Sequence, residues 1–227
     1  MTTHVALIGR PVSHSRSPRM HNAAFAALGL DWYYSAFEVD DPLAAVAALV
    51  RLGFVGTNVT IPFKRDVVAA CDEADGESVN TLVFAGGRVV GSNTDREILA
   101  GIAARRACLI GAGGAALALR PALPPDTREF SRGGRWPPSA EGCDLIVNAT
   151  PVTEELLVSP SGDQTVVDLA YRRDGADTAL VAAARAAGCP VVDGLEALVR
   201  QGARSFEVWT GRPAPIGVMR DAVRAGP

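Results

Sequence analysis

The sequence predicts an α/β protein made of two α/β domains, of which the first has a mainly parallel sheet. Apolar stretches of strand length alternate with helix-length stretches rich in Ala, Leu and Val up to about Asp95, and a second alternating series follows. Such alternation is typical of parallel strands joined by helices. The length of 227 residues suits one large or two small domains. We expect residues 1–95 and 194–227 to form one domain and residues 96–193 the other.

Local signals place the elements of the first domain. Apolar or alternating stretches predict strands at 5–8, 32–39, 58–61, 81–84 and 88–90. Helices are expected at 19–28, 42–52 and 66–72. Ser17 as a cap and Pro18 in the first turn predict the start of the first helix, and Gly29 predicts its end.

The second series begins with a helix over 96–106 and a strand over 107–110. A glycine-rich turn then opens a helix that reaches about Leu123. Further strands are expected at 127–130, 145–148, 165–169 and 190–192, and further helices at 177–187, 195–210 and 218–225. The interval 132–142, rich in Pro and Gly, is predicted to be a loop.

Composition excludes several classes of function. The net charge of −3 and the absence of long basic runs argue against nucleic acid or an anionic membrane as the main partner. The longest apolar runs, such as 43–50, are too short to span a bilayer, and the N-terminus lacks a signal-peptide pattern. The four cysteines and three histidines show no metal-ligand spacing, so we expect free buried thiols, no metal and a cytoplasmic location.

Lys64 is the only lysine among 22 basic residues. Arginine keeps its proton in proteins, whereas lysine can titrate when its surroundings favour the neutral amine. Lys64 ends the stretch Asn58-Val-Thr-Ile-Pro-Phe-Lys64, just past a predicted strand, where scaffolds commonly present catalytic groups. We interpret Lys64 as a functional amine, and the alternative is a surface lysine without a function that was retained by chance.

Gly111-x-Gly113-x-x-Ala116 follows a predicted strand and opens a predicted helix, as a dinucleotide-binding turn requires. Its backbone N–H groups can approach a pyrophosphate. After the next strand stand Ser131 and Arg132, and a guanidinium there suits the 2′-phosphate of NADP. Glu129 keeps NAD as the weaker alternative, and a solvated loop arginine is the plain interpretation of Arg132.

A series of motifs resembles the shikimate dehydrogenase family in order and spacing over nearly the whole chain. The motifs are Ser13-His-Ser-Arg-Ser-Pro18, Asn58-Val-Thr-Ile-Pro-Phe-Lys64, Val79-Asn-Thr81, Asn93-Thr-Asp95, Gly111-Ala-Gly-Gly-Ala115, Asn148-Ala-Thr150, and Asp193-Gly-Leu195 followed by Gln201. The resemblance implies a substrate domain, a Rossmann-like NADP-binding domain, and reversible reduction of 3-dehydroshikimate to shikimate without a metal. Such an enzyme serves chorismate and aromatic amino-acid biosynthesis.

The resemblance also implies roles for individual residues. Lys64 and Asp95 match the catalytic pair, with capping of a helix at Arg96 as a further role for Asp95. The positions that match substrate-binding residues are Ser15, Ser17, Thr60, Asn80, Tyr171 and Gln201. Those that match cofactor-binding residues are Gly111, Gly113, Gly114, Ala115, Ser131, Arg132, Thr150, Leu169 and Gly194.

The chain is shorter than is usual for the family between Asp72 and Val79, after Asp95, and after Arg132, so the cofactor domain is expected to be shortened. Three alternatives stay open: a quinate dehydrogenase, an aminoshikimate dehydrogenase, and a non-catalytic ring-acid-binding relative with a degenerate cofactor domain. The protein is expected to act as a monomer or homodimer on a small molecule.

Overall fold

The computed structural model describes residues 1–225, which divide into two compact units. Unit 1 comprises Met1–Ile98 and Val199–Ala225, and unit 2 comprises Leu99–Leu198. The expected domains divide close to these points, at residues 95/96 and 193/194, and residues 226–227 of the expected first domain lie outside the described residues. The division of labour between a substrate domain and a cofactor domain stays a prediction.

Unit 1 contains a mixed six-stranded sheet of order β2-β1-β3-β5-β6-β4. Its strands are β1 (Thr3–Gly9), β2 (Trp32–Glu38), β3 (Gly56–Val59), β4 (Glu73–Ala74), β5 (Thr81–Ala85) and β6 (Arg88–Ser92). β1 pairs in parallel with β2 and β3, and β4 pairs in parallel with β6, whereas β5 is antiparallel to β3 and β6. The two strands predicted at 81–84 and 88–90 therefore form a hairpin, β5–β6.

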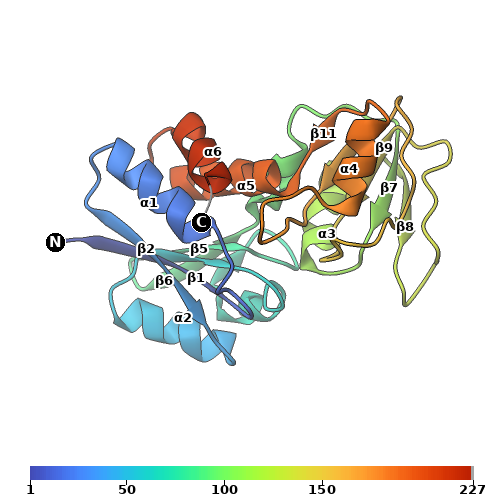
Figure 1. Ribbon diagram of the computed structural model, residues 1–227. Helices are drawn as coiled ribbons and strands as arrows, with labels where there is room; N and C mark the ends of the chain where they lie inside the picture. The colour runs from blue at the N-terminus through green and yellow to red at the C-terminus, as the bar shows by residue number, and fades with distance from the viewer. Residues whose placement is uncertain (226–227) are drawn as a thin grey trace. The chain divides into compact units, whose positions relative to one another are not determined.

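The helices of unit 1 cover both faces of this sheet. They are α1 (Ser17–Ala27), α2 (Pro42–Arg51), α5 (Gly194–Thr210, which begins in unit 2) and α6 (Ile216–Arg224). Figure 1 shows α1, α5 and α6 on one face and α2 on the other. The α2 face buries a cluster that includes Ile8, Val46, Leu49 and Leu82. Burial of such side chains is the main source of stability for a sheet covered on both faces.

Two local expectations in unit 1 are wrong, and one strand was not expected. Ser17 is the first residue of α1 rather than its cap, and Arg16 at the capping position makes no side-chain capping hydrogen bond. The expected helix over 66–72 is a shorter 3₁₀ helix, η1 (Asp66–Ala70). The short strand β4 was not expected, because two exposed residues carry no periodic signal.

Unit 2 contains a parallel five-stranded sheet of order β11-β10-β9-β7-β8. Its strands are β7 (Arg106–Ile110), β8 (Asp126–Phe130), β9 (Leu145–Asn148), β10 (Thr165–Asp168) and β11 (Val191–Val192). Its helices are α3 (Gly114–Leu119), the 3₁₀ helix η3 (Arg120–Ala122) and α4 (Ala179–Ala186). This is the predicted Rossmann-like alternation, and within the described residues no helix connects β8 to β9 or β9 to β10.

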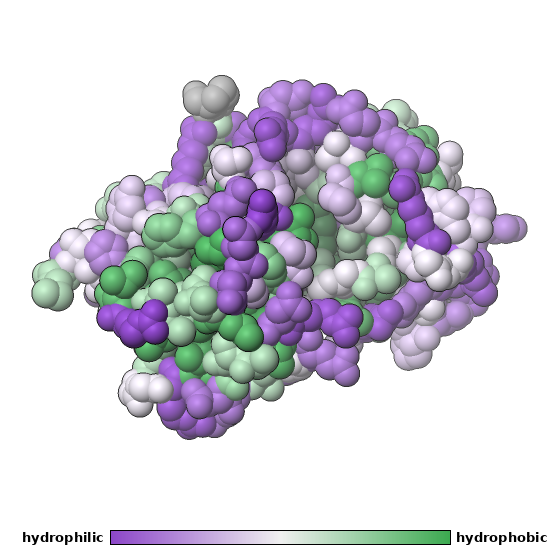
Figure 2. All heavy atoms as spheres, turned by 90° about the horizontal axis from the view of Figure 1, so that it is seen from below, coloured by the Kyte–Doolittle hydropathy of each residue, from purple (hydrophilic) through white to green (hydrophobic). Residues whose placement is uncertain are grey.

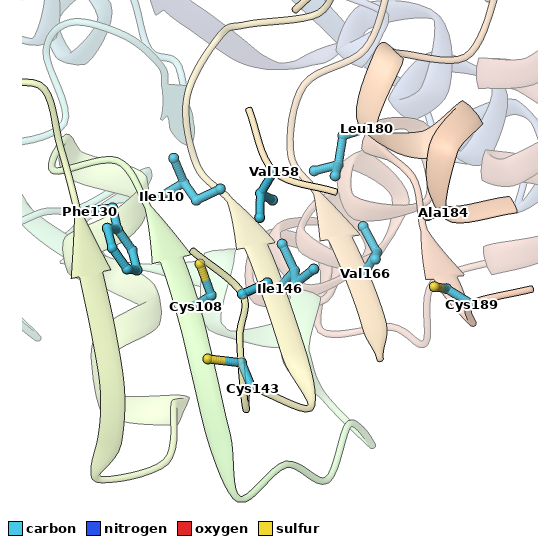
Figure 3. Close-up of a cluster of buried hydrophobic side chains, with 11 residues drawn as sticks. Cys108, Ile110, Phe130, Cys143, Ile146, Val158, Val166, Leu180, Ala184 and Cys189 are labelled. Atoms are coloured by element: carbon cyan, nitrogen blue, oxygen red, sulfur yellow. The ribbon is translucent and has the colours of Figure 1, made fainter. Parts of the chain in front are cut away.

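Loops take the place of those helices over the core of unit 2. Figure 3 shows Cys108, Ile110, Ile146 and Val166 of the sheet packed with Leu180 of α4. Ala140, Cys143 and Val158, from the two connecting loops, belong to the same buried cluster. The shortened unit thus still closes an apolar core, in agreement with the predicted loop over 132–142.

Two helix expectations in this half are also wrong. Instead of a helix over 96–106, the chain forms the 3₁₀ helix η2 (Thr94–Leu99) and an irregular segment before β7. Gly101 has φ 77°, which ends the helical path, and Asp144 accepts the backbone N–H groups of Arg105 and Arg106. The helix expected to reach Leu123 ends as α3 at Leu119 and continues only as η3.

The four cysteines are free thiols, as predicted, and Cys108, Cys143 and Cys189 are buried, whereas Cys71 is only half-buried. Hydrophobic side chains gather on the surface of unit 1 on its α2 side (Figure 2), where Leu43, Val50 and Leu52 are exposed. Among residues 1–225 no helix combines the length and apolarity needed to cross a membrane.

Candidate active site

The Lys64 amine is held by a carboxylate. Lys64 Nζ donates to Asp95 Oδ2 at 2.6 Å, and the side chains are only 12% and 5% exposed. Lys64 lies in the turn after β3, and its carbonyl accepts the backbone N–H of Val79 at 2.8 Å. This bond ties the lysine turn to the segment that carries Asn80. The predicted catalytic pair is therefore assembled within unit 1.

The second Asp95 oxygen is also occupied. Asn80 Nδ2 donates to Asp95 Oδ1 at 2.7 Å. Asp95 lies inside η2 rather than before a helix, and Asn93 Oδ1 accepts the Asp95 backbone N–H. The expectation that Asp95 caps a helix is therefore wrong. Its carboxylate faces the lysine and the amide instead.

A buried network of hydroxyls and amides orients Asn80. Asn80 Oδ1 accepts from the Thr94 N–H at 2.9 Å and from the Thr81 hydroxyl at 2.9 Å. The Ser205 hydroxyl of α5 lies 2.9 Å from Thr81 Oγ1 and 3.0 Å from Asn58 Nδ2. Because these donors hold Oδ1, the Asn80 NH₂ group is left to face Asp95.

The network continues from Asn58 to Tyr34 of β2. The Tyr34 hydroxyl donates to Asn58 Oδ1 at 2.8 Å. Burial raises the pKa of Tyr34, so the phenol keeps its proton. Ser15 Oγ accepts the Ser17 N–H at 3.2 Å.

The remaining predicted substrate residues fall in both units. Thr60 follows β3, where its N–H bonds the Ile8 carbonyl at 2.9 Å. Gln201 lies in α5, and its carbonyl accepts from Ser205 Oγ at 3.2 Å. Tyr171 follows β10 in unit 2. Unit 1 therefore contains Ser15, Ser17, Thr60, Lys64, Asn80, Asp95 and Gln201, of which Lys64, Asp95 and Asn80 are joined by hydrogen bonds. Tyr171 belongs to unit 2.

The predicted cofactor positions lie at the carboxyl ends of the unit 2 strands. Gly111 follows β7 with φ 124°, and an added Cβ would lie 2.9 Å from the Ala149 carbonyl oxygen. Gly113 precedes α3, which begins at Gly114 and contains Ala115. No atom lies within 4 Å of a Cβ added at Gly113. The turn thus needs glycine at its start and leaves open space at Gly113, as close approach of a ligand to the backbone requires.

Thr150 and Leu169 follow the neighbouring strands β9 and β10. The Thr150 hydroxyl donates to Asn148 Oδ1 at 2.7 Å, and the Leu169 N–H bonds the Asn148 carbonyl. A Cβ added to Gly194 would lie 2.1 Å from the Ala170 carbonyl oxygen, so α5 can start against this turn only with glycine. These strand ends are adjacent in a parallel sheet, the usual place for a ligand in such a fold.

Ser131 and Arg132 follow β8. The Arg132 guanidinium lies over the Trp136 ring, 5.7 Å from its centroid, and pairs with Glu155 at 3.7 Å. Glu129, the residue that would favour NAD, forms an ion pair with Arg120. Within the described residues, His, Cys, Asp and Glu form no cluster of three suited to a metal.

Sequence reasoning missed two members of the network, Tyr34 and Ser205. Tyr34 and Ser205 occupy buried positions of a strand and a helix, so the hydrophobic pattern alone predicts that they are ordinary core residues. Asn58 was part of a motif but had no role assigned. Its polar side chain in a short apolar strand was a signal that could have been used, because a buried amide needs hydrogen-bond partners.

A buried amine–carboxylate pair in one α/β unit and a glycine-rich turn at the strand ends of a second, parallel α/β unit define a protein of the two-domain dehydrogenase class. Comparison with known proteins specifies the family. A family model described as "Shikimate dehydrogenase substrate binding domain" matches residues 7–82, and one described as "Shikimate 5'-dehydrogenase C-terminal domain" matches residues 194–224.

The chain is 37% identical to a shikimate dehydrogenase (NADP(+)) of Moorella thermoacetica, over 97% of this chain and 92% of the relative. The crystal structure of shikimate 5-dehydrogenase from Thermus thermophilus in complex with NADP(H) and shikimate has a TM-score of 0.84 and 32% identity, and covers 98% of this chain and 99% of its own. Another shikimate dehydrogenase crystal structure, in complex with NADP+, has a TM-score of 0.85 and 31% identity over 98% of this chain and 94% of its own. The chain belongs to the shikimate dehydrogenase family.

Proposed function

We propose that this protein catalyses the reversible reduction of 3-dehydroshikimate to shikimate with NADPH. The observation that carries the proposal is the buried Lys64–Asp95 pair, in a chain that belongs to the shikimate dehydrogenase family. The reaction serves chorismate and aromatic amino-acid biosynthesis. The buried free thiols fit a reducing cytoplasm, and the protein acts there as a monomer or homodimer.

The substrate is a polyhydroxylated ring acid, and unit 1 offers matching groups. The Ser15 and Ser17 hydroxyls bind the carboxylate, and Thr60, Asn80 and Gln201 bind the ring hydroxyls. Tyr171 of unit 2 is assigned to the carboxylate as well. Hydroxyls and amides suit such a substrate, because they can donate and accept without burying net charge.

Lys64 moves the proton of the reacting hydroxyl. In the direction of reduction the Lys64 ammonium gives a proton to the ring oxygen, and in the direction of oxidation the neutral amine takes it back. Lysine has three donor hydrogens, and Asp95 occupies one. Asp95 therefore orients the amine while leaving hydrogens for the substrate oxygen, and Asn80 holds the carboxylate in place from its other side.

The residues of unit 2 fit NADP. Gly113 leaves the backbone open to a pyrophosphate, and Gly111, Gly114 and Ala115 are assigned to the same turn. Ser131 with Arg132 suits the 2′-phosphate. Thr150, Leu169 and Gly194 are assigned to the nicotinamide side. Glu129 is engaged by Arg120, which supports NADP over NAD. When bound, NADPH supplies the hydride that the ring carbonyl carbon accepts.

Lys64→Ala tests the role of the amine. We expect kcat to fall by about 10²- to 10⁴-fold, the usual contribution of a positioned general acid–base. The dissociation constant for shikimate should change little, since hydroxyls and amides supply most contacts. Absorbance of NADPH gives the rates, and calorimetric titration gives binding. Arg65→Ala is the matched control, because Arg65 is the exposed neighbour.

The same assay with shikimate and quinate, each paired with NADP and NAD, separates the alternatives. Turnover with shikimate and NADP supports the proposal. Preference for quinate would assign the chain to a sister activity. Binding of shikimate without reduction of either cofactor would make the protein a non-catalytic relative and overturn the enzyme assignment.

A further inference from the structure

Arg132 is held in the loop after β8 by a turn of its own backbone and by Trp136. The Ser131 N–H bonds the Arg135 carbonyl at 3.1 Å, and the Gly134 N–H bonds the Ser131 carbonyl at 3.0 Å. The Arg132 guanidinium lies over the Trp136 ring, 5.7 Å from its centroid. A cation over an aromatic face is attracted by the ring. The turn and the ring therefore position this arginine without help from outside the loop.

A carboxylate from a different loop nevertheless pairs with Arg132. Glu155 lies in the segment between β9 and β10, and its Oε2 atom is 3.7 Å from Arg132 Nη2. Because β7 separates β8 from β9 in the sheet, the pair joins the loops that follow the two neighbours of β7. Among residues 1–225, Arg132 is the only ion-pair partner of Glu155. A substitution at Glu155 therefore changes this one ionic contact.

The 2′-phosphate of NADP and the Glu155 carboxylate require the same guanidinium. The side chains of Arg132 and Glu155 are 74% and 62% exposed, so a ligand can reach the pair. An exposed ion pair contributes little free energy and can be exchanged. A phosphate forms stronger, charge-assisted hydrogen bonds with a guanidinium. Binding of the phosphate therefore separates Arg132 from Glu155 and leaves the Glu155 carboxylate close to a second anion.

We propose that Glu155 is a specificity-determining residue that competes with the 2′-phosphate of NADP for Arg132 and so reduces the preference for NADP over NAD. The inference rests on the proposed function, which assigns Arg132 to that phosphate. NAD has no such phosphate, so its binding does not require the pair to separate. The opposite role, in which Glu155 orients Arg132 for the phosphate, is not needed, because the turn and Trp136 already position the guanidinium.

Glu155→Gln tests the competition, because glutamine keeps the size of the side chain and removes its charge. We expect the dissociation constant for NADP, measured by calorimetric titration, to fall by about two- to fivefold, the range set by an exposed ion pair. The dissociation constant for NAD should stay the same. Glu154→Gln is the matched control, since Glu154 is the preceding residue, is also exposed and pairs with Arg172 instead. It should bind both cofactors like the unmodified protein.

A double variant separates competition from direct repulsion between the two anions. Arg132→Ala removes the group for which they compete, so adding Glu155→Gln to Arg132→Ala should give no tightening of NADP binding. If the full gain in affinity remained without Arg132, repulsion between the carboxylate and the phosphate would explain it, and the competition would be overturned.

Binding and turnover distinguish the inference from the proposed function. Unchanged or weaker NADP binding by the Glu155→Gln protein would overturn the inference, and weaker binding would show that Glu155 orients Arg132. Shikimate-dependent reduction of NADP by the unmodified protein would leave the proposed function intact in that case. Unchanged NADP binding by the Arg132→Ala protein would remove the phosphate assignment itself, and the inference with it.

Discussion

At the scale of single residues, one lysine and its partners carry the proposed chemistry. Lys64 contacts Asp95, Asp95 contacts Asn80, and Asn80 is held by Thr81 and Thr94. Each contact fixes the orientation of the next group, so the amine is pre-organised before any ligand binds. Pre-organised polar groups in a dry site are more effective than mobile ones in water.

Arg132 gives a prediction at this scale. Arg132→Ala should raise the KM for NADP by about tenfold or more, because a charge-assisted contact with a phosphate is lost. The KM for NAD, which lacks that phosphate, should stay the same. Initial rates with both cofactors at saturating shikimate measure the effect. An equal rise in the KM for NADP and the KM for NAD would show instead that Arg132 maintains the structure of the loop and does not bind the 2′-phosphate.

The site residues that could be predicted belong to polar motifs at the ends of strands, where such a motif has few structural uses. Lys64 and Asp95 come after β3 and β6, Asn80 directly precedes β5, and the structure brings the three together. Tyr34 and Ser205 could not be predicted, because their spacing is that of core positions. Their roles depend on which hydroxyls meet across β2, β3 and α5, and this is a property of the tertiary structure.

At the scale of elements, the start of α5 is built against the turn after β10. A Cβ at Gly194 would lie 2.1 Å from the Ala170 carbonyl oxygen and 3.0 Å from the Tyr171 backbone nitrogen. Backbone atoms cannot yield as a flexible side chain can. The turn that carries Leu169 and Tyr171 is therefore shaped by the absence of a side chain at Gly194.

Gly194→Ala should consequently displace this turn. We expect a loss of about 1–3 kcal/mol in the free energy of unfolding, as for other overpacked sites. We also expect a higher KM for NADP. Denaturant unfolding and initial rates provide the two measurements. Gly162→Ala is a useful comparison, since its added Cβ would also meet a backbone oxygen, Ala187 O at 2.6 Å, at a site with no proposed role. If the Gly194→Ala protein had the same KM for NADP as the Gly162→Ala protein, the turn after β10 would have no part in the cofactor site.

Strands were predicted better than helices, for a physical reason. Buried parallel strands such as β9 are short apolar runs whose ends coincide with polar residues. The helix expected over 96–106 has good helix formers, but Gly101 takes φ 77° and Asp144 captures the N–H groups of Arg105 and Arg106. Those N–H groups lower the pKa of Asp144. The helix propensity of this segment is therefore overridden by hydrogen bonds to Asp144, a residue 38 or more positions away in the sequence.

At the scale of the whole molecule, one buried carboxyl links folding to pH. Asp168 is fully buried at the end of β10, and it accepts from Asn148 Nδ2 at 2.9 Å, Thr178 Oγ1 at 2.5 Å and the Ala170 N–H at 3.0 Å. Burial nevertheless raises the pKa of Asp168 to about 6, above its ordinary 3.8. The network joins β9, β10 and the start of α4.

Between pH 3.8 and 6 the folded state therefore holds a proton on Asp168 that the unfolded chain has released. Lowering the pH from 7 to 5 should stabilise the protein by about 1 kcal/mol through this group, and raising the pH again should remove that gain. Asp168→Asn supplies the reference, because it lacks the titration. Urea unfolding at both pH values gives the difference between the two proteins, and a difference of zero or of opposite sign would contradict the prediction.

The end position of β8 in the unit 2 sheet has a further consequence. A terminal strand offers unpaired backbone groups on which the strands of other molecules can assemble. Here the strand Asp126–Phe130 carries Arg128 and Glu129 near its middle, and Arg128 also donates to the Glu141 carbonyl at 2.9 Å. These charged side chains, and the loop that contains Glu141, oppose pairing of β8 with a strand of a second molecule. The chain can therefore end its sheet at β8 without making that edge a seed for fibrils.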